Sequence, residues 1–201
     1  MNREFGGPTR LGMILIGVVF FLIVAGLFFF ITNGSRSAPT TSNDDTSRRF
    51  VTTISPSRSV RMTVYGPIVA NEDRESYEIT ISSSTRRFAA YTGYAQTQVA
   101  SSEYGNTESG YQELVYALSR AGFDKERVLN EAENDDRGTC ATGRRYVYEL
   151  FDNGDQIKRA WTTSCNSARG SFAGNNEMVR ALFAKQIPDV SDAMKALKTL
   201  R

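Results

Sequence analysis

The side chains that could carry out chemistry are few, because the 201-residue chain contains no histidine. This absence excludes Ser–His–Asp and Cys–His catalysis and removes a principal ligand of protein zinc sites. A Ser–Lys pair is the remaining histidine-free way to activate one of the many serines, and no SxxK motif occurs. Paired carboxylates can cleave glycosides, but no such pair stands out in the sequence. We therefore predict no catalytic residue.

An acidic run is a candidate cation site. It comprises Glu131, Glu133, Asp135 and Asp136. An EF-hand loop alternates its ligands around a central glycine, and this run has neither feature. The run is typical of a solvated loop, so we predict no metal and no cofactor.

The two cysteines, Cys140 and Cys165, are not spaced as a CxxC redox pair. They flank a predicted hairpin, whose strands 144–151 and 156–164 are joined by a turn containing Asn153-Gly154. Pairing about this turn joins positions whose residue numbers add up to about 306–307. The numbers of Cys140 and Cys165 add up to 305, so the two cysteines fall nearly opposite each other at the open end of the hairpin. Paired strands already provide the Cα spacing of about 5.5 Å that a disulfide needs. We predict a Cys140–Cys165 disulfide.

Two groups of residues are candidates for binding. The first lies on predicted strands: Trp161 could stack on a sugar or anchor a partner, and Tyr91 and Arg87, with Arg144 or Arg145, could form an aromatic–basic sheet face. For Trp161 a core position against the helices is the competing interpretation, and any open antiparallel sheet face has this general character.

The second group lies in the loop 165–176, which contains Arg169 and Phe172 and ends at Asn175, a predicted helix N-cap. Backbone N–H groups at a helix N-terminus favour anions. A plain flexible connection between strand and helix is the competing interpretation.

The chain from residue 60 onward predicts an α+β domain. Period-two alternation indicates strands near 60–65, 77–82, 87–94 and 97–104, followed later by the hairpin. Helical spacing indicates a helix capped by Ser109, a short helix after Asp124, a helix after Asn175 and a last helix from Asp189 to Leu200. We expect an antiparallel sheet of about six strands with amphipathic helices on one face.

The N-terminal part predicts a membrane anchor. Residues 11–31 carry no charge, amide or hydroxyl side chain, and as a helix they would extend about 30 Å, the thickness of a bilayer's hydrocarbon core. We assign residues 1–10 to a short cytoplasmic tail and 32–59 to a flexible Ser/Thr-rich linker, whose apolar residues Phe50, Val51 and Ile54 are expected to dock on the domain. A signal peptide cleaved near Ser37 is the alternative.

Charge and redox chemistry orient this anchor. The flanking arginines are nearly balanced and only lean towards a cytoplasmic N-terminus. The predicted disulfide favours an oxidising compartment, which places residues 60–201 outside the plasma membrane. These residues carry 18 Lys and Arg against 19 Asp and Glu, so their charge offers no case for nucleic-acid binding.

The sequence thus predicts a single-pass membrane protein, in contact with the lipid bilayer, that presents an extracytoplasmic binding or envelope-organising domain. Its expected partner is an envelope protein or a wall polymer. Two alternatives remain open: a cell-envelope hydrolase that uses carboxylates, and an extracytoplasmic protease inhibitor that uses the loop 166–176 as its contact.

Overall fold

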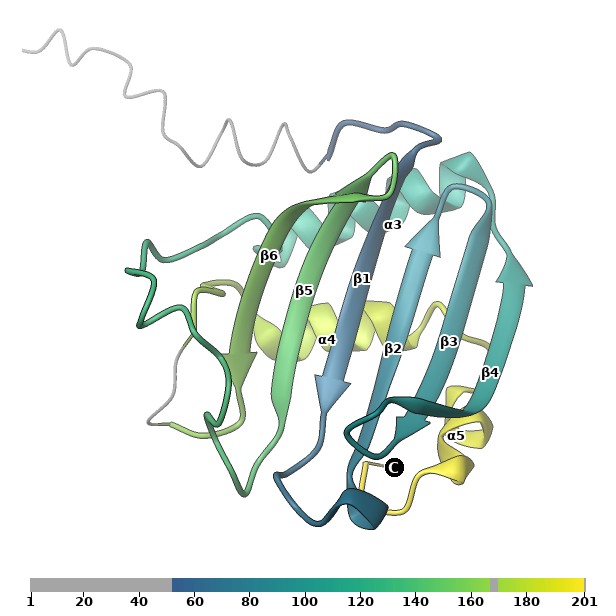
Figure 1. Ribbon diagram of the computed structural model, residues 1–201. Helices are drawn as coiled ribbons and strands as arrows, with labels where there is room; N and C mark the ends of the chain where they lie inside the picture. The colour runs from purple at the N-terminus through teal and green to yellow at the C-terminus, as the bar shows by residue number, and fades with distance from the viewer. Residues whose placement is uncertain (1–51, 167–169, 201) are drawn as a thin grey trace, which may run out of the picture. The chain divides into compact units, whose positions relative to one another are not determined.

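Six antiparallel strands form one sheet in a computed structural model that describes residues 52–166 and 170–200 (Figure 1). The strand order is β4-β3-β2-β1-β5-β6. The strands are β1 (Arg58–Tyr65), β2 (Glu75–Ser82), β3 (Thr85–Thr92), β4 (Thr97–Gly105), β5 (Arg145–Asp152) and β6 (Asp155–Thr163). The predicted six-stranded antiparallel sheet is confirmed, and β1 lies inside it between β2 and β5.

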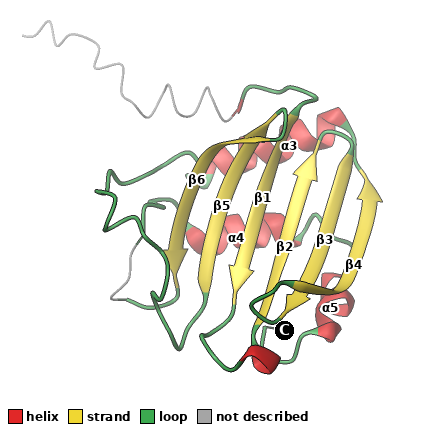
Figure 2. Ribbon diagram, viewed as in Figure 1, coloured by secondary structure: helices red, strands yellow, loops and turns green. Residues whose placement is uncertain are grey.

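Two helices, α3 (Glu108–Arg120) and α4 (Asn176–Ala184), cross the same face of the sheet (Figure 2). A shorter helix, α5 (Val190–Ala193), follows near the lower end of β4, and two 3₁₀ turns cover Asn71–Asp73 and Met194–Ala196. The α+β class is therefore confirmed. We call the sheet face opposite α3 and α4 the open face.

The core lies between the sheet and its helices, where the period-two and helical patterns predicted it. Alternate strand positions and one stripe of α3 are at most 4% exposed. These residues include Val60, Met62, Val64, Ile79, Ile81, Phe88, Tyr148, Leu150, Tyr111, Leu114, Val115 and Leu118. Ile54 of the predicted linker packs against this core, as expected, and its expected companions Phe50 and Val51 lie outside the described residues.

Both outer strand pairs contain a β-bulge. The register shifts between Ala90 and Tyr91 in the β3–β4 pair, and between Leu150 and Phe151 in the β5–β6 pair. A bulge bends its strand and increases the local twist. The extra residues, Val99 and Ile157, are among the exposed large apolar side chains.

The helix ends agree with the sequence in one case and correct it in another. Asn175 caps α4, and its side chain accepts a hydrogen bond from the Met178 N–H. The cap of α3 is Thr107, which accepts from Gly110 N–H, rather than the predicted Ser109. Both positions offer a hydroxyl, so local pattern alone did not separate them.

Two predicted helical segments are wrong. Residues 125–130 form no helix; the Arg127 N–H instead donates to the Ser171 carbonyl, so this stretch runs beside the chain that follows β6. The last helix stops at Ala193, a 3₁₀ turn follows, and Asp189 makes no side-chain cap. Beyond the turn, the buried carboxylate of Glu75 accepts hydrogen bonds from the backbone N–H groups of residues 198–200. These N–H groups therefore bind a carboxylate instead of the carbonyl groups of a preceding helical turn.

The predicted anchor, 11–31, and most of the linker lie outside the described residues. Within 52–166 and 170–200, no helix combines the length and the apolar character needed to cross a membrane.

Candidate functional site on the open sheet face

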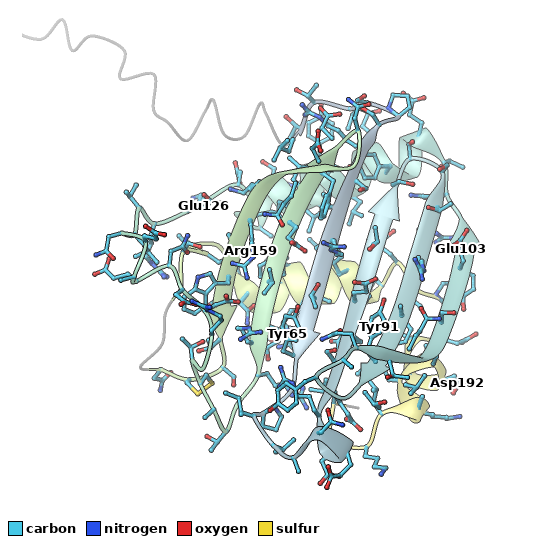
Figure 3. The ribbon with its side chains drawn as sticks, viewed as in Figure 1. Tyr65, Tyr91, Glu103, Glu126, Arg159 and Asp192 are labelled. Carbon is cyan, nitrogen blue, oxygen red and sulfur yellow. A yellow bond between two sulfur atoms is a disulfide. The ribbon has the colours of Figure 1, made fainter. Side chains whose placement is uncertain are left out.

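One row of mostly charged side chains crosses the open face, with one residue from each strand. The row follows from the pairing register, because directly opposed residues of neighbouring strands share a face. In sheet order it reads Glu103, Arg87, Thr80, Arg61, Glu149 and Arg159. Figure 3 shows Glu103 and Arg159 near opposite edges of this face. We call this set the charged row.

Arg61 is the centre of the charged row. Its Nε donates to Glu149 Oε2 at 2.8 Å, and its NH1 lies 4.0 Å from Glu78 Oε2. Its guanidinium carbon also lies 4.4 Å from the centre of the Phe151 ring. Burial lowers the pKa of Arg61, but the hydrogen bond and charge of Glu149 outweigh that effect and raise it. Arg61 is therefore a fixed cation between two carboxylates.

Tyr91 extends this network onto the next strand pair. Its hydroxyl donates to Glu78 Oε1 at 2.9 Å. Burial and this hydrogen bond both raise the pKa of Tyr91, so its hydroxyl stays protonated and acts as a donor at neutral pH. The carboxylate of Glu78 thus accepts a hydrogen bond from the neutral hydroxyl of Tyr91 and lies near the cation of Arg61.

Arg87 is the exposed cation of the charged row. Its NH2 donates to Gln98 Oε1 at 3.2 Å. Among the described residues, no carboxylate lies within ion-pair distance of its guanidinium. The structure thus brings Arg87 and Tyr91 to the face for which the sequence proposed them, and Arg145 shares that face. Arg144 does not belong to it: its side chain donates to the Thr199 carbonyl.

Asp136 fastens a loop over the β5–β6 side of the open face. This carboxylate is only 9% exposed, and its Oδ2 lies 3.1 Å from Arg145 Nε and 2.8 Å from Arg159 NH2. The predicted acidic run is thus explained in part by ion pairs, since Asp135 also binds Arg137. Within the described residues, no group of three or more potential metal ligands gathers.

The disulfide lies at the base of the same loop. Cys140 and Cys165 are bonded, with their Cα atoms 5.6 Å apart. The prediction is confirmed, although Cys140 lies in a turn with φ of 52° rather than on the strand. The link joins the loop that carries Asp136 to the end of β6.

Trp161 lies beneath this loop on the open-face side of β6, directly opposite Val147. Its indole Nε1 donates to the side-chain oxygen of Asn134 at 2.9 Å, and the residue is only 3% exposed. The expected burial is present, but on the face away from the helices. A ring this well covered packs the loop against the sheet.

The loop 165–176 does not approach the charged row with either of its described candidates. Phe172 is 2% exposed in the core, with its ring centre 4.6 Å from that of Tyr148. Asn175 is the N-cap of α4. Arg169 lies outside the described residues. A binding role for this loop stays a prediction.

A second aromatic–arginine cluster lies at the lower end of the open face, and the sequence did not indicate it. The guanidinium carbons of Arg145 and Arg74 lie 4.4 Å and 5.6 Å from the centre of the Tyr65 ring. Arg74 also lies 5.4 Å from the ring centre of Tyr94. Figure 3 shows Tyr65 at this end of the face. We call these four residues the Arg74 cluster.

No protein-family model matches the chain, and no curated protein matches it significantly in sequence. Any function therefore has to be argued from the chemistry of the site itself.

Proposed function

We propose that the chain is a non-enzymatic, single-pass membrane protein whose α+β domain lies outside the cell and binds a component of the envelope through its open sheet face. The observation that carries this proposal is the charged row. Helices α3 and α4 cover one face of the sheet, while the other displays a cross-strand array of donors, acceptors and aromatic rings.

The chemistry of this array suits recognition of a polar, extended ligand. Arg87 has free donor capacity and Gln98 beside it is exposed, whereas Arg61, Glu78 and Tyr91 are fixed by one another. Side chains locked by their neighbours lose little entropy when a ligand binds. The array is therefore preorganised at its centre and available for contact around Arg87.

The same geometry disfavours the carboxylate hydrolase. Glu78 and Glu149 are both neighbours of Arg61, which keeps a cation at the position between them. A glycosidase pair instead needs one protonated carboxyl and space for the substrate between the two groups. No observation favours the protease inhibitor, since Phe172 is buried in the core.

A binding assay with matched charge reversals tests the proposal. The full chain in detergent would be sedimented with insoluble wall polymer. Arg87→Glu should abolish co-sedimentation, because Arg87 is exposed and bonded only to Gln98 among the described residues. Arg120→Glu, an equally large charge change at the exposed end of α3, should retain it. Equal behaviour of the two variants would contradict binding through the open face.

A further inference from the structure

Arg74 is a buried cation with no carboxylate partner. The residue is 7% exposed, and among the described residues no carboxylate lies within 4.0 Å of its guanidinium. Of the acids close to it in the sequence, Glu72 and Asp73 are exposed, and the buried carboxylate of Glu75 binds the N–H groups of residues 198–200 instead. Buried charges in proteins are normally paired, so an unpaired one calls for an explanation.

The hydrogen bonds of Arg74 use only one side of its guanidinium. Both are made by NH1, which donates to the carbonyls of Gly66 and Pro67. A guanidinium has five N–H donors, so Nε and NH2 keep three of them. These two nitrogens are not among the buried atoms that lack a partner, so they reach solvent. Nε and NH2 together form the side-on fork that binds a carboxylate or phosphate through two parallel hydrogen bonds.

The surroundings of Arg74 add positive charge. Arg145 shares the Tyr65 ring with it, and Arg159 lies near Arg145 because both bind the carboxylate of Asp136. Arg145 and Arg159 thus share the single carboxylate of Asp136, while Arg74 binds none among the described residues. Their charge is not neutralised within the described residues, and a site of this sign attracts anions.

We infer that the Arg74 cluster is an oxyanion site: the Nε/NH2 fork of Arg74 binds a phosphate or carboxylate group of the ligand, and Arg145 adds attraction through its charge. This inference deepens the proposed function, on which it rests for the identity of the molecule that carries the anion. The exposed side chains of Ile68, Val69 and Tyr94 lie near Arg74, because the Tyr94 hydroxyl donates to the Val69 carbonyl and Arg74 binds the adjoining Pro67. They would contact apolar atoms next to the anion.

The test titrates the full chain in detergent with inorganic phosphate and, separately, with acetate, against chloride at matched ionic strength. Backbone amide chemical shifts report binding. We expect saturable shifts at residues 65–66, 74 and 93–94, and the anion that binds more tightly identifies the chemical class. Shifts that do not saturate, or that spread over the whole surface, would overturn the inference.

Variants separate the fork from general charge. Arg74→Lys keeps the cation but has only a point donor, so affinity should fall about tenfold with the loss of one of two parallel bonds. Arg120→Gln should bind as the parent does. Unchanged affinity in Arg74→Lys would overturn the inference; if this variant does not fold, the shift map of the parent chain decides alone. If the chain co-sediments with the envelope component but the titration shows no anion binding, only the oxyanion site is rejected. If the anion binds but the chain does not co-sediment, only the envelope ligand is rejected.

Discussion

The carboxylate of Glu75 binds the backbone and side chain of Thr199, which follows it by 124 residues. Glu75 Oε2 accepts from Thr199 N at 2.8 Å and from Thr199 Oγ1 at 2.6 Å, and Oε1 accepts from Lys198 N at 2.6 Å. This contact holds the C-terminal segment on the sheet, where Leu197 and Leu200 are at most 1% exposed.

Replacing Glu75 with glutamine should destabilise the domain by about 2 kcal/mol, since hydrogen bonds to a charged group contribute roughly 1.5–3 kcal/mol each and the amide keeps one acceptor oxygen. Urea unfolding of the full chain in detergent measures the free energy of unfolding. Glu72→Gln, a change at an exposed residue nearby, is the matched control and should change it little. Equal stability of the two variants would show that the contact is dispensable.

The same contact should make the C-terminal segment sensitive to acid. Burial raises the pKa of Glu75, but hydrogen bonds from residues 198–200 outweigh it, so the pKa lies below its ordinary value of 4.5. A lowered folded-state pKa means that the stabilisation is fully present above pH 4.5 and is lost as pH falls through the folded-state pKa.

Hydrogen exchange at the amides of Thr199 and Leu200 should therefore accelerate in acid before the core strands open. The intrinsic exchange rate at each pH has to be divided out, so the comparison is of protection factors. In Glu75→Gln these factors should be low at every pH. A parent chain whose C-terminal protection factors stay constant until the core strands themselves open in acid would contradict this account.

The parts of the fold that depend on local sequence pattern were predictable. The alternation in β1 and β2 and the apolar stripe of α3 predict which side chains are buried. The turn residues Asn153-Gly154 predict a hairpin that places the two cysteines close together. The end of the chain was not predictable in this way. Residues 190–200 have a helical apolar pattern, but their last part is not helical and binds the distant Glu75, a contact that no local pattern states.

The site was less predictable for the same reason. Arg61 and Glu78 occupy polar positions of predicted strands, but nothing local states that β5 pairs with β1 and brings Glu149 beside Arg61. Tyr91 and Arg87 could be found because one strand carries both. Arg74 precedes its strand by a single residue, and no pattern distinguishes it from an ordinary surface arginine.

Gly170 should tolerate no side chain, because a β-carbon there would overlap the Trp161 ring and its carbonyl oxygen. We expect Gly170→Ala to cost about 1–3 kcal/mol through overpacking, and to shift the fluorescence of Trp161, the chain's only tryptophan, towards that of an exposed indole. Gly105→Ala is the control, since its β-carbon would meet nothing within 4 Å. Fluorescence unchanged in Gly170→Ala would show that this segment moves aside without disturbing the ring.

The disulfide offers a joint test of stability and location. It closes a loop with a sequence separation of 25, for which the chain-entropy estimate is roughly 3 kcal/mol. Reduction, or replacement of both cysteines by serine, should lower the free energy of unfolding by about this amount. It should also raise exchange in residues 130–140, whose attachment then depends on Asp136 and Trp161.

In intact cells, the same bond reports the compartment. If the domain lies outside, a membrane-impermeant maleimide should label Cys140 and Cys165 only after treatment with an impermeant reductant. A control protein with a known cytoplasmic thiol should stay unlabelled throughout. Labelling without reductant would mean free thiols outside, and labelling only after lysis would place the domain on the cytoplasmic side. The first result would contradict the disulfide but not the orientation. The second would contradict the proposed orientation, which rests on the oxidising compartment that favours this disulfide.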